Sequence, residues 1–116
     1  MRYEWDERKN RLNQRKHDGI SFELAALVFR DPDCLIELDR VDEAGEQHWH
    51  ALGMASIEPG VGDFLLVVHT YSRPSDEGLP PGSAKENNDG EETIRIISAR
   101  RAGKNDVRRY QEQAVD

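Results

Sequence analysis

The chain has 116 residues, a length that fits one domain, and its 36% hydrophobic and 34% charged residues allow only a thin core. The net charge of −7 at neutral pH, taken alone, argues against a nucleic-acid partner. No apolar run approaches the roughly 20 residues of a membrane-spanning helix, and the N-terminus lacks the apolar stretch of a signal peptide. A single cysteine excludes an internal disulfide and a cysteine-rich zinc site. We therefore expect a cytoplasmic protein that forms one domain over residues 1–116.

The charges are segregated along the chain. Residues 1–18 carry six basic and four acidic side chains, a net charge of +2. Residues 19–94 carry four basic and sixteen acidic side chains, a net charge of −12, whereas residues 95–110 carry six basic and one acidic, a net charge of +5. If the fold brings the two basic ends together, an acidic protein still presents a cationic face. Association with RNA depends on that local field more than on the total charge.

The N-terminal segment predicts a strand followed by a helix. Tyr3 and Trp5 alternate with charged residues, as in a short strand. Asp6 is a suitable N-cap for a helix that runs to about Lys16, and Gly19 follows its end. This helix is poor in apolar residues, and it carries basic residues at i, i+3 and i+7 on one face: Arg8, Arg11 and Arg15. Such a stripe is either a solvated face or a functional basic surface.

Apolar residues dominate the centre of the chain. Ser21 is a suitable cap for a second helix over residues 22–29, which is apolar almost all round and is therefore expected to be buried, and Pro32 follows its end. Four strand patterns come next, at residues 34–38, 47–54, 64–68 and 93–99. The continuous apolar run of the third pattern is typical of a central strand covered on both faces. A final helix is expected to begin at Asn105 or Lys104 and to run to about Gln113.

The order of these elements predicts the fold class. Sequential strands joined by turns form a mainly antiparallel sheet, so we expect an α+β domain with helices packed on that sheet. The segment 72–91 holds three prolines, three glycines and a single large apolar residue, Leu79. It is therefore expected to form a mobile excursion between two strands.

Arginines are concentrated on and after the last predicted strand. Strand alternation places Arg95 and Ala99 on one face of the sheet and Ile94 and Ile96 on the other. Further candidates follow at the strand end and in the last helix: Arg100, Arg101, Arg108, Arg109 and Tyr110. A guanidinium group can donate hydrogen bonds to two oxygens of one phosphate, and when held in place it stabilises the extra negative charge of a transition state. Because arginine clusters also form ion-pairing or solvated surfaces, spacing alone leaves both interpretations open.

The histidines offer two further candidate sites. His17 follows Lys16 at the end of the first helix, where a neutral imidazole can act as a general base and a lysine can bind a phosphate. The alternative is a histidine that interacts with the free carbonyl groups of the helix end. His48 and His50 share one strand face, and with His69 from a neighbouring strand they offer three imidazoles for zinc. No further ligand pattern supports this site, so we expect no metal.

Several motifs occur in the order typical of one known family. They are Tyr3-Glu4-Trp5-Asp6 at the start, Asn13-Gln14-Arg15-Lys16-His17 with Gly19-Ile20-Ser21-Phe22-Glu23, then Val28-Phe29 with Asp31-Pro32, and finally Arg95-Ile96-Ile97-Ser98-Ala99-Arg100 with Arg108-Arg109-Tyr110. Together they resemble the BrnT toxins. The resemblance spans nearly the whole chain apart from residues 72–91.

This resemblance implies a RelE-like ribonuclease toxin of a type II toxin–antitoxin system, which halts translation by cutting RNA without a metal or cofactor. It also implies a BrnA-type antitoxin partner, whose ribbon-helix-helix part binds operator DNA. In such cleavage the ribose 2′-OH attacks the adjacent phosphate, so a base must take its proton and cations must stabilise the phosphate. Carried over by position, the catalytic candidates are Arg95 and Arg100 as phosphate stabilisers, Lys16 near them and His17 as the base. The RNA-binding candidates are Arg101, Arg108, Arg109 and Tyr110, of which Tyr110 either contacts a base or packs against the protein.

Two departures from the family pattern support an alternative function. Gln47-His48 stands where the family has Glu-Arg after Gly-Glu, which removes one expected arginine. The acidic residues of segment 72–91 would repel RNA if that segment folded over the site. The alternative is a catalytically weak or inactive module that binds the antitoxin as a co-repressor.

Overall fold

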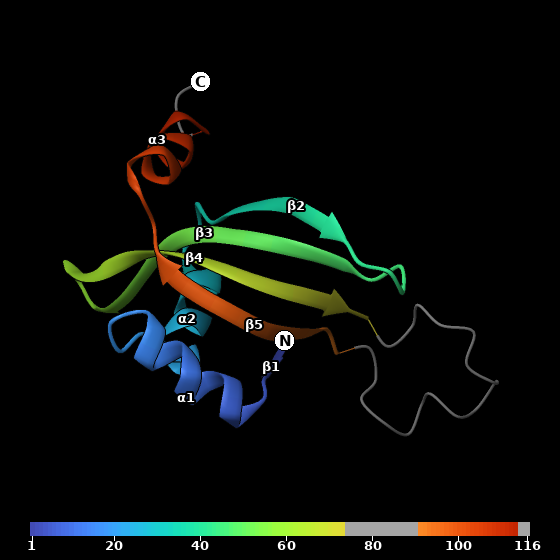
Figure 1. Cartoon of the computed structure of the whole chain (residues 1–116). Helices are drawn as coiled ribbons and strands as arrows, with labels where there is room; N and C mark the ends of the chain where they lie inside the picture. The colour runs from blue at the N-terminus through green and yellow to red at the C-terminus, as the bar shows by residue number, and fades with distance from the viewer. Residues whose placement is uncertain (74–90, 114–116) are drawn as a thin grey trace.

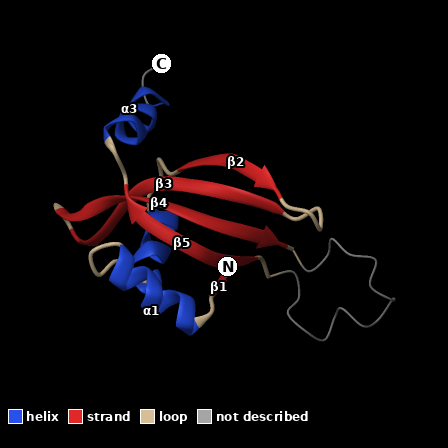
Figure 2. Ribbon diagram, viewed as in Figure 1, coloured by secondary structure: helices blue, strands red, loops and turns tan. Residues whose placement is uncertain are grey.

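The computed structural model describes residues 1–73 and 91–113, which form an α+β fold around one five-stranded sheet (Figures 1 and 2). The elements in chain order are β1 (Arg2–Glu4), α1 (Glu7–Lys16), α2 (Phe22–Ala26), the 3-10 helix η1 (Leu27–Arg30), β2 (Leu35–Val41), β3 (Gln47–Glu58), β4 (Val61–Ser72), β5 (Thr93–Arg101) and α3 (Lys104–Gln113). None of the helices in the described ranges is long and apolar enough to cross a membrane. Most of the excursion expected at 72–91 lies outside the described residues.

The sheet has the order β1-β5-β4-β3-β2 and is mixed. The three pairs among β2, β3, β4 and β5 are antiparallel, as predicted, but β1 runs parallel to β5. β1 pairs with residues 93–95, and α1 then continues in the same direction until Asn13 reaches Ala99. The sheet is therefore mainly antiparallel, as expected, and β1 adds one parallel pair that makes it mixed.

All four strand patterns are confirmed, and each strand is longer than its apolar pattern. The β3–β4 hairpin turns at Pro59 and Gly60, and Gly60 has a φ of 80°, which favours glycine. The backbone hydrogen bonds of the sheet continue beyond the apolar residues into polar residues at the strand ends. The apolar patterns could not indicate these polar residues. The predicted second helix is shorter than expected, because α2 ends at Ala26 and continues as η1.

The main core lies between the sheet and the helices α1, α2 and η1, on what we call the helical face. Figure 1 shows α1 and α2 on this side of the sheet and α3 beyond the opposite side. The buried apolar side chains of this cluster come from α2, η1, the loop before α2 and the three central strands: Ile20, Phe22, Ala25, Val28, Ala51, Ala55, Leu65, Val67, Ile94, Ile96 and Ala99. Leu66 points to the opposite face and is also buried, so β4 is covered on both faces as predicted.

A β-bulge in β5 changes which residues face the core. Val68 pairs with Ser98 and His69 pairs with Ile96, so Ile97 is an extra residue in β5. Before the bulge Ile96 lies in the core, and after it Ala99 does. The predicted alternation, which put Ala99 on the face of Arg95, is therefore wrong, because one extra residue inverts the pattern. The same inversion turns Arg100 to the face opposite the core.

Two buried asparagines attach α1 to the rest of the protein. The Asn13 side chain accepts a hydrogen bond from the Ala99 N–H at 3.1 Å and donates to the carbonyl oxygens of Ala99 at 2.9 Å and Ile20 at 3.0 Å. Asn10 accepts from the Phe22 N–H at 2.8 Å. Both asparagines are at least 95% buried, whereas Leu12 is 54% exposed. The helix is therefore held by polar side chains rather than by an apolar stripe.

α3 is attached mainly through its last turns. Tyr110 donates its hydroxyl to Asp31 Oδ2 at 2.7 Å, and its ring packs edge-on against Phe64 at a centroid distance of 5.0 Å. Asp31 also accepts the Met54 N–H at 2.8 Å. Burial raises the pKa of Asp31, but these hydrogen bonds and that from the Asp33 N–H outweigh it, so the pKa lies below its ordinary value. The carboxylate therefore ties α3 to β3.

We expect Asn13→Ala to lower the free energy of unfolding by about 2–3 kcal/mol, because it leaves the buried N–H and C=O of Ala99 without these partners. Leu12→Ala, on the exposed face of the same helix, is the matched control and should cost less than about 0.5 kcal/mol. Urea unfolding followed by circular dichroism measures both. Equal stabilities of the two variants would contradict the role assigned to Asn13.

Candidate functional site

An open pocket of about 250 Å³ lies where the end of α1 meets the end of β5. Its lining residues are mostly cationic or able to carry a proton: Lys16, His17, Asp18, Ile20, Arg100 and Arg101. The pocket therefore joins the two basic ends of the chain. Clustered cations in one depression attract phosphate through their local field even when the whole protein is acidic.

The end of α1 places Lys16 and His17 at this pocket. Asn13 fixes that end of the helix to Ala99, the residue immediately before Arg100. The backbone N–H of His17 closes the helix by donating to the Asn13 carbonyl at 2.9 Å. Within the described ranges the His17 imidazole makes no hydrogen bond, so its ring does not cap the helix and can contact a ligand in the pocket.

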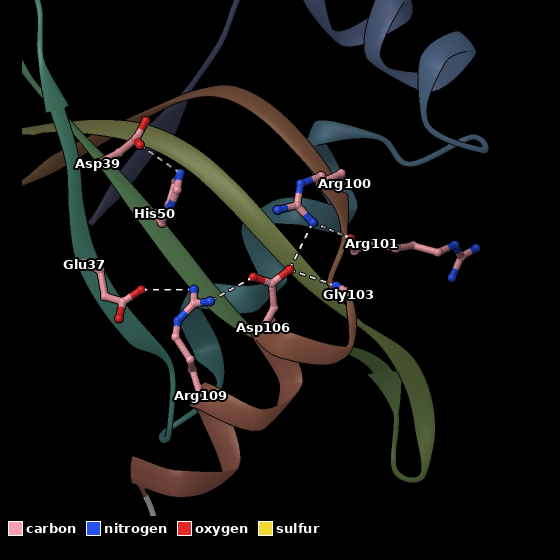
Figure 3. Close-up of polar contacts among 8 residues, drawn as sticks. All are labelled: Glu37, Asp39, His50, Arg100, Arg101, Gly103, Asp106 and Arg109. Carbon is pink, nitrogen blue, oxygen red and sulfur yellow. Dashed lines mark hydrogen bonds and ion pairs between the residues drawn. The ribbon is translucent and has the colours of Figure 1, made fainter.

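Arg100 is oriented by Asp106 of α3 (Figure 3). One guanidinium nitrogen of Arg100 lies 3.1 Å from Asp106 Oδ2 and 3.0 Å from the carbonyl oxygen of Arg101. The Arg100 side chain is still 46% exposed, whereas that of Asp106 is 13% exposed. The Arg100 guanidinium is therefore accessible to an anion, whereas its carboxylate partner is largely covered.

Asp106 is the centre of a network that joins α3 to the sheet. It accepts the Gly103 N–H at 2.8 Å, the contact that an N3 carboxylate makes with the residue before a helix. It also accepts from Arg109 at 3.1 Å, and Arg109 binds Glu37 of β2 at 3.1 Å. Burial raises the pKa of Asp106, but the hydrogen bonds from Gly103, Arg100 and Arg109 outweigh it and leave the pKa below its ordinary value. Asp106 is therefore ionised and able to hold both arginines.

Arg101 sits on the other side of the pocket and is engaged with two carboxylates. It lies 2.8 Å from Asp63 Oδ1 and 3.8 Å from Asp18 Oδ2. All three groups are substantially exposed, so these pairs contribute little to stability and can open for an anionic ligand.

The remaining predicted residues lie elsewhere. Arg95 is five residues before Arg100, roughly 16 Å away along the strand, and lies 3.6 Å from Glu4. Arg108 lines a separate depression at the start of α3. Arg109 cross-links α3 to β2, and Tyr110 packs against Phe64 with its hydroxyl on Asp31. The structure thus brings Lys16, His17, Arg100 and Arg101 together and separates the other four candidates.

The three histidines considered as zinc ligands do not share a face. His69 pairs with Trp49 and packs edge-on against Phe29 of η1, so it points to the helical face. His48 and His50 flank Trp49 and point the other way, where they lie 3.0 Å from Asp42 and 3.4 Å from Asp39. The structure therefore contradicts a site that combines all three imidazoles.

One carboxylate and histidine cluster occupies the β2–β3 turn. Asp42, Glu46 and His48 each have a ligand-type atom within 4.8 Å of the others. Asp42 accepts the N–H groups of Ala44 and Glu46, both at 2.9 Å, and the ring nitrogen of His48 at 3.0 Å. These hydrogen bonds account for the cluster as the organisation of a hairpin turn.

A comparison with family models decides the identity of the chain. The model described as "Ribonuclease toxin, BrnT, of type II toxin-antitoxin system" matches residues 5–106. The chain belongs to the BrnT toxin family. A search of curated proteins gave no match. Family membership supports a ribonuclease toxin and implies an antitoxin partner, and the matched residues contain the whole basic pocket of the toxin.

Sequence reasoning missed two residues that position the toxin's pocket. Asn13 belongs to a motif that the sequence displays, but nothing in its pattern shows that it binds the backbone of a strand 86 positions later. Asp106 is the single acidic residue among the basic residues of 95–110, which is a signal for an ion-pairing centre. The sequence did not show that Asp106 pairs with Arg100, because Arg100 faces α3 only as a result of the bulge in β5.

His69 should make the stability of the toxin depend on pH. Burial lowers the pKa of His69 to about 4, from an ordinary value of 6.5. Between these values the unfolded chain binds a proton that the folded chain does not, so this contribution is fully present above pH 6.5 and is lost as the pH falls toward 4. We expect the parent to lose about 2 kcal/mol through this group between pH 7 and pH 5.

His69→Gln should remove that part of the pH dependence, whereas His17→Gln should retain it. Urea unfolding at the two pH values gives the free energy of unfolding of the parent and of each variant. Subtracting a variant's pH-dependent change from that of the parent cancels the contribution of the carboxylates, which both proteins share. The same pH-dependent loss in His69→Gln as in the parent would contradict the assignment.

Proposed function

We propose that this toxin is a RelE-like endoribonuclease that cleaves RNA without a metal, in the pocket formed by Lys16, His17, Arg100 and Arg101. The observation that carries the proposal is that these four residues, from opposite ends of the chain, line one depression. A fixed guanidinium, an ammonium and an unengaged imidazole are the groups that metal-free phosphodiester cleavage requires.

In the proposed reaction the ribose 2′-OH attacks the adjacent phosphorus. His17 takes the proton of the 2′-OH, and Arg100 binds the phosphate oxygens that gain negative charge. The bond to the 5′-oxygen breaks, leaving a 2′,3′-cyclic phosphate, and the leaving oxygen takes a proton from Lys16. Arg101 binds the substrate beside this step. Arg95 has no part in the step, since its distance from the pocket and its position beside Glu4 fit contact with a more distant part of the RNA.

The chemistry of the lining residues supports a reaction that needs no divalent ion. Magnesium and calcium bind to groups of carboxylate and carbonyl oxygens. Asp18 is the one carboxylate among the residues that line the pocket, and its side chain is 79% exposed and lies beside Arg101. The positive charge that a metal supplies in other nucleases is provided by guanidinium and ammonium groups in this proposal.

We further propose that the antitoxin is BrnA-like, with a ribbon-helix-helix part, and that the toxin meets operator DNA only through it. The toxin would act in the cytoplasm, where its RNA substrates are. A basic antitoxin segment suits a toxin whose residues 19–94 carry a net charge of −12.

One observation favours the alternative of a weak or inactive co-repressor. Arg100 and Arg101 are both paired with carboxylates, from Asp106, Asp63 and Asp18. These pairs reduce the positive charge that a phosphate meets. The two functions differ in outcome, because the co-repressor binds the antitoxin without cutting RNA.

The test is incubation of purified toxin with RNA in the presence of a chelator. We expect cleavage by the parent, and a rate lowered by about 100-fold or more in Arg100→Ala, because a fixed donor to the transition state is lost. Arg95→Ala is the matched control and should keep most of the rate. Mass spectrometry of the products should show 2′,3′-cyclic phosphate ends.

Equal rates for the parent and Arg100→Ala would remove Arg100 from the reaction. Cleavage that appears only when a divalent ion is restored would reject the metal-free step. If the parent does not cut RNA but forms a stable complex with its antitoxin, the co-repressor function replaces the proposed one.

A further inference from the structure

The outer face of α1 carries a stripe of exposed arginines, which we call the α1 stripe: Arg8, Arg11 and Arg15. Their spacing places them on one side of the helix, opposite the buried Asn10 and Asn13. They span about 10 Å along the helix axis. The stripe is therefore a fixed cationic surface on a helix that its asparagines anchor to the sheet.

The α1 stripe has no ion pair in the part of the chain that the structure describes. Elsewhere in the described ranges Arg30 and Arg108 also have no ion pair, whereas six arginines are paired with carboxylates: Arg2, Arg40, Arg95, Arg100, Arg101 and Arg109. The acidic character of the whole protein makes this contrast informative, because 23 carboxylate side chains stand against 16 cationic ones. Three of the arginines without an ion pair in the described residues thus share one face of α1.

Helix stability does not explain the α1 stripe. Like charges three and four residues apart repel one another on a helix surface, as Arg11 does with Arg8 and Arg15. Arg8 also lies in the first turn, where the helix dipole disfavours a cation. Only Arg15, in the last turn, is placed favourably with respect to the dipole. An anionic ligand along the stripe would remove both unfavourable terms.

The α1 stripe leads to the pocket. Lys16 follows Arg15 directly and lines the pocket together with Arg100. A polyanion that has one phosphate in the pocket can therefore continue along α1 without crossing an acidic surface of that helix. The opposite direction, toward α3, meets Asp106 and Glu37.

We propose that the α1 stripe binds the sugar–phosphate backbone of single-stranded RNA next to the phosphate held in the pocket. This proposal rests on the proposed function, because it assigns a place to the same substrate. Arginine contacts to phosphates are independent of base sequence, so the α1 stripe contributes affinity and direction rather than base preference.

The test measures RNA binding as a function of salt concentration. The probe is a 2′-O-methyl RNA long enough to cover both the pocket and α1, which keeps its phosphates and cannot be cleaved by 2′-OH attack. Each lost contact between a cation and a phosphate of a single strand lowers the slope of log K against log salt by about 0.7. We expect the triple variant Arg8→Gln/Arg11→Gln/Arg15→Gln to lower that slope by about 2.

The matched control is Arg2→Gln/Arg30→Gln/Arg40→Gln, which makes the same change in net charge away from α1. It should keep the parent slope. A dinucleotide probe, which fills only the pocket, should bind the α1 triple variant and the parent alike. Circular dichroism checks that both triple variants keep the parent's helix content, since glutamine has nearly the helix propensity of arginine.

An unchanged slope in the α1 triple variant overturns the proposal, as does an equal loss in the control variant. Competition by poly-glutamate as strong as that by the RNA, with the same dependence on the three arginines, also overturns it and assigns the face to an acidic protein segment. Absence of cleavage of unmodified RNA by the parent rejects the proposed function alone, because the binding slopes are measured without any cleavage.

Discussion

The contact between Asn13 and Ala99 brings the two halves of the basic pocket together. β1 pairs only with residues 93–95 of β5, so the N–H and C=O of Ala99 have no strand partner on that side. The Asn13 amide supplies both an acceptor and a donor, and thus takes the place of a neighbouring strand. Because buried backbone polar groups must be paired, this contact fixes α1 along β5. Lys16 and His17 are thereby held beside Arg100.

The carboxylates around the pocket both organise and weaken it. Asp106 fixes the direction of the Arg100 guanidinium, and in the proposed reaction this would favour catalysis by a prearranged group. The same ion pair must share the guanidinium with an incoming phosphate, which reduces affinity. In the proposed complex, a substrate that gains affinity from a second cationic surface, whose arginines have no ion pair in the described residues, would avoid this conflict. The arginines of α1 have the position and the charge to bind the RNA backbone while the pocket holds the phosphate that reacts.

The sequence predicted features that depend on neighbours along the chain and failed at those that depend on distant ones. Asp6 and Ser21 cap their helices as their residue types indicate, and apolar alternation located the strands. The parallel pairing of β1 and the anchoring of α1 by Asn13 depend on partners more than 80 residues away, which no local pattern encodes. The sequence showed two basic ends but did not show whether the fold brings them together. The buried asparagines were also missed, because the search for buried helix positions relied on apolar residues.

The bulge in β5 makes the face that each arginine occupies depend on the local strand pairing as well as on residue type. Ile97 is the extra residue that sends Ala99 into the core and Arg100 to the opposite face. In a homologue with the same number of residues but no bulge at this point, strict alternation from Ile96 would turn the side chain aligned with Arg101 toward α3 and the one aligned with Arg100 to the core side. Two such toxins would share every residue of this strand and still differ in which guanidinium meets α3, so alignments of this strand should be judged by the position of the bulge as well as by residue identity.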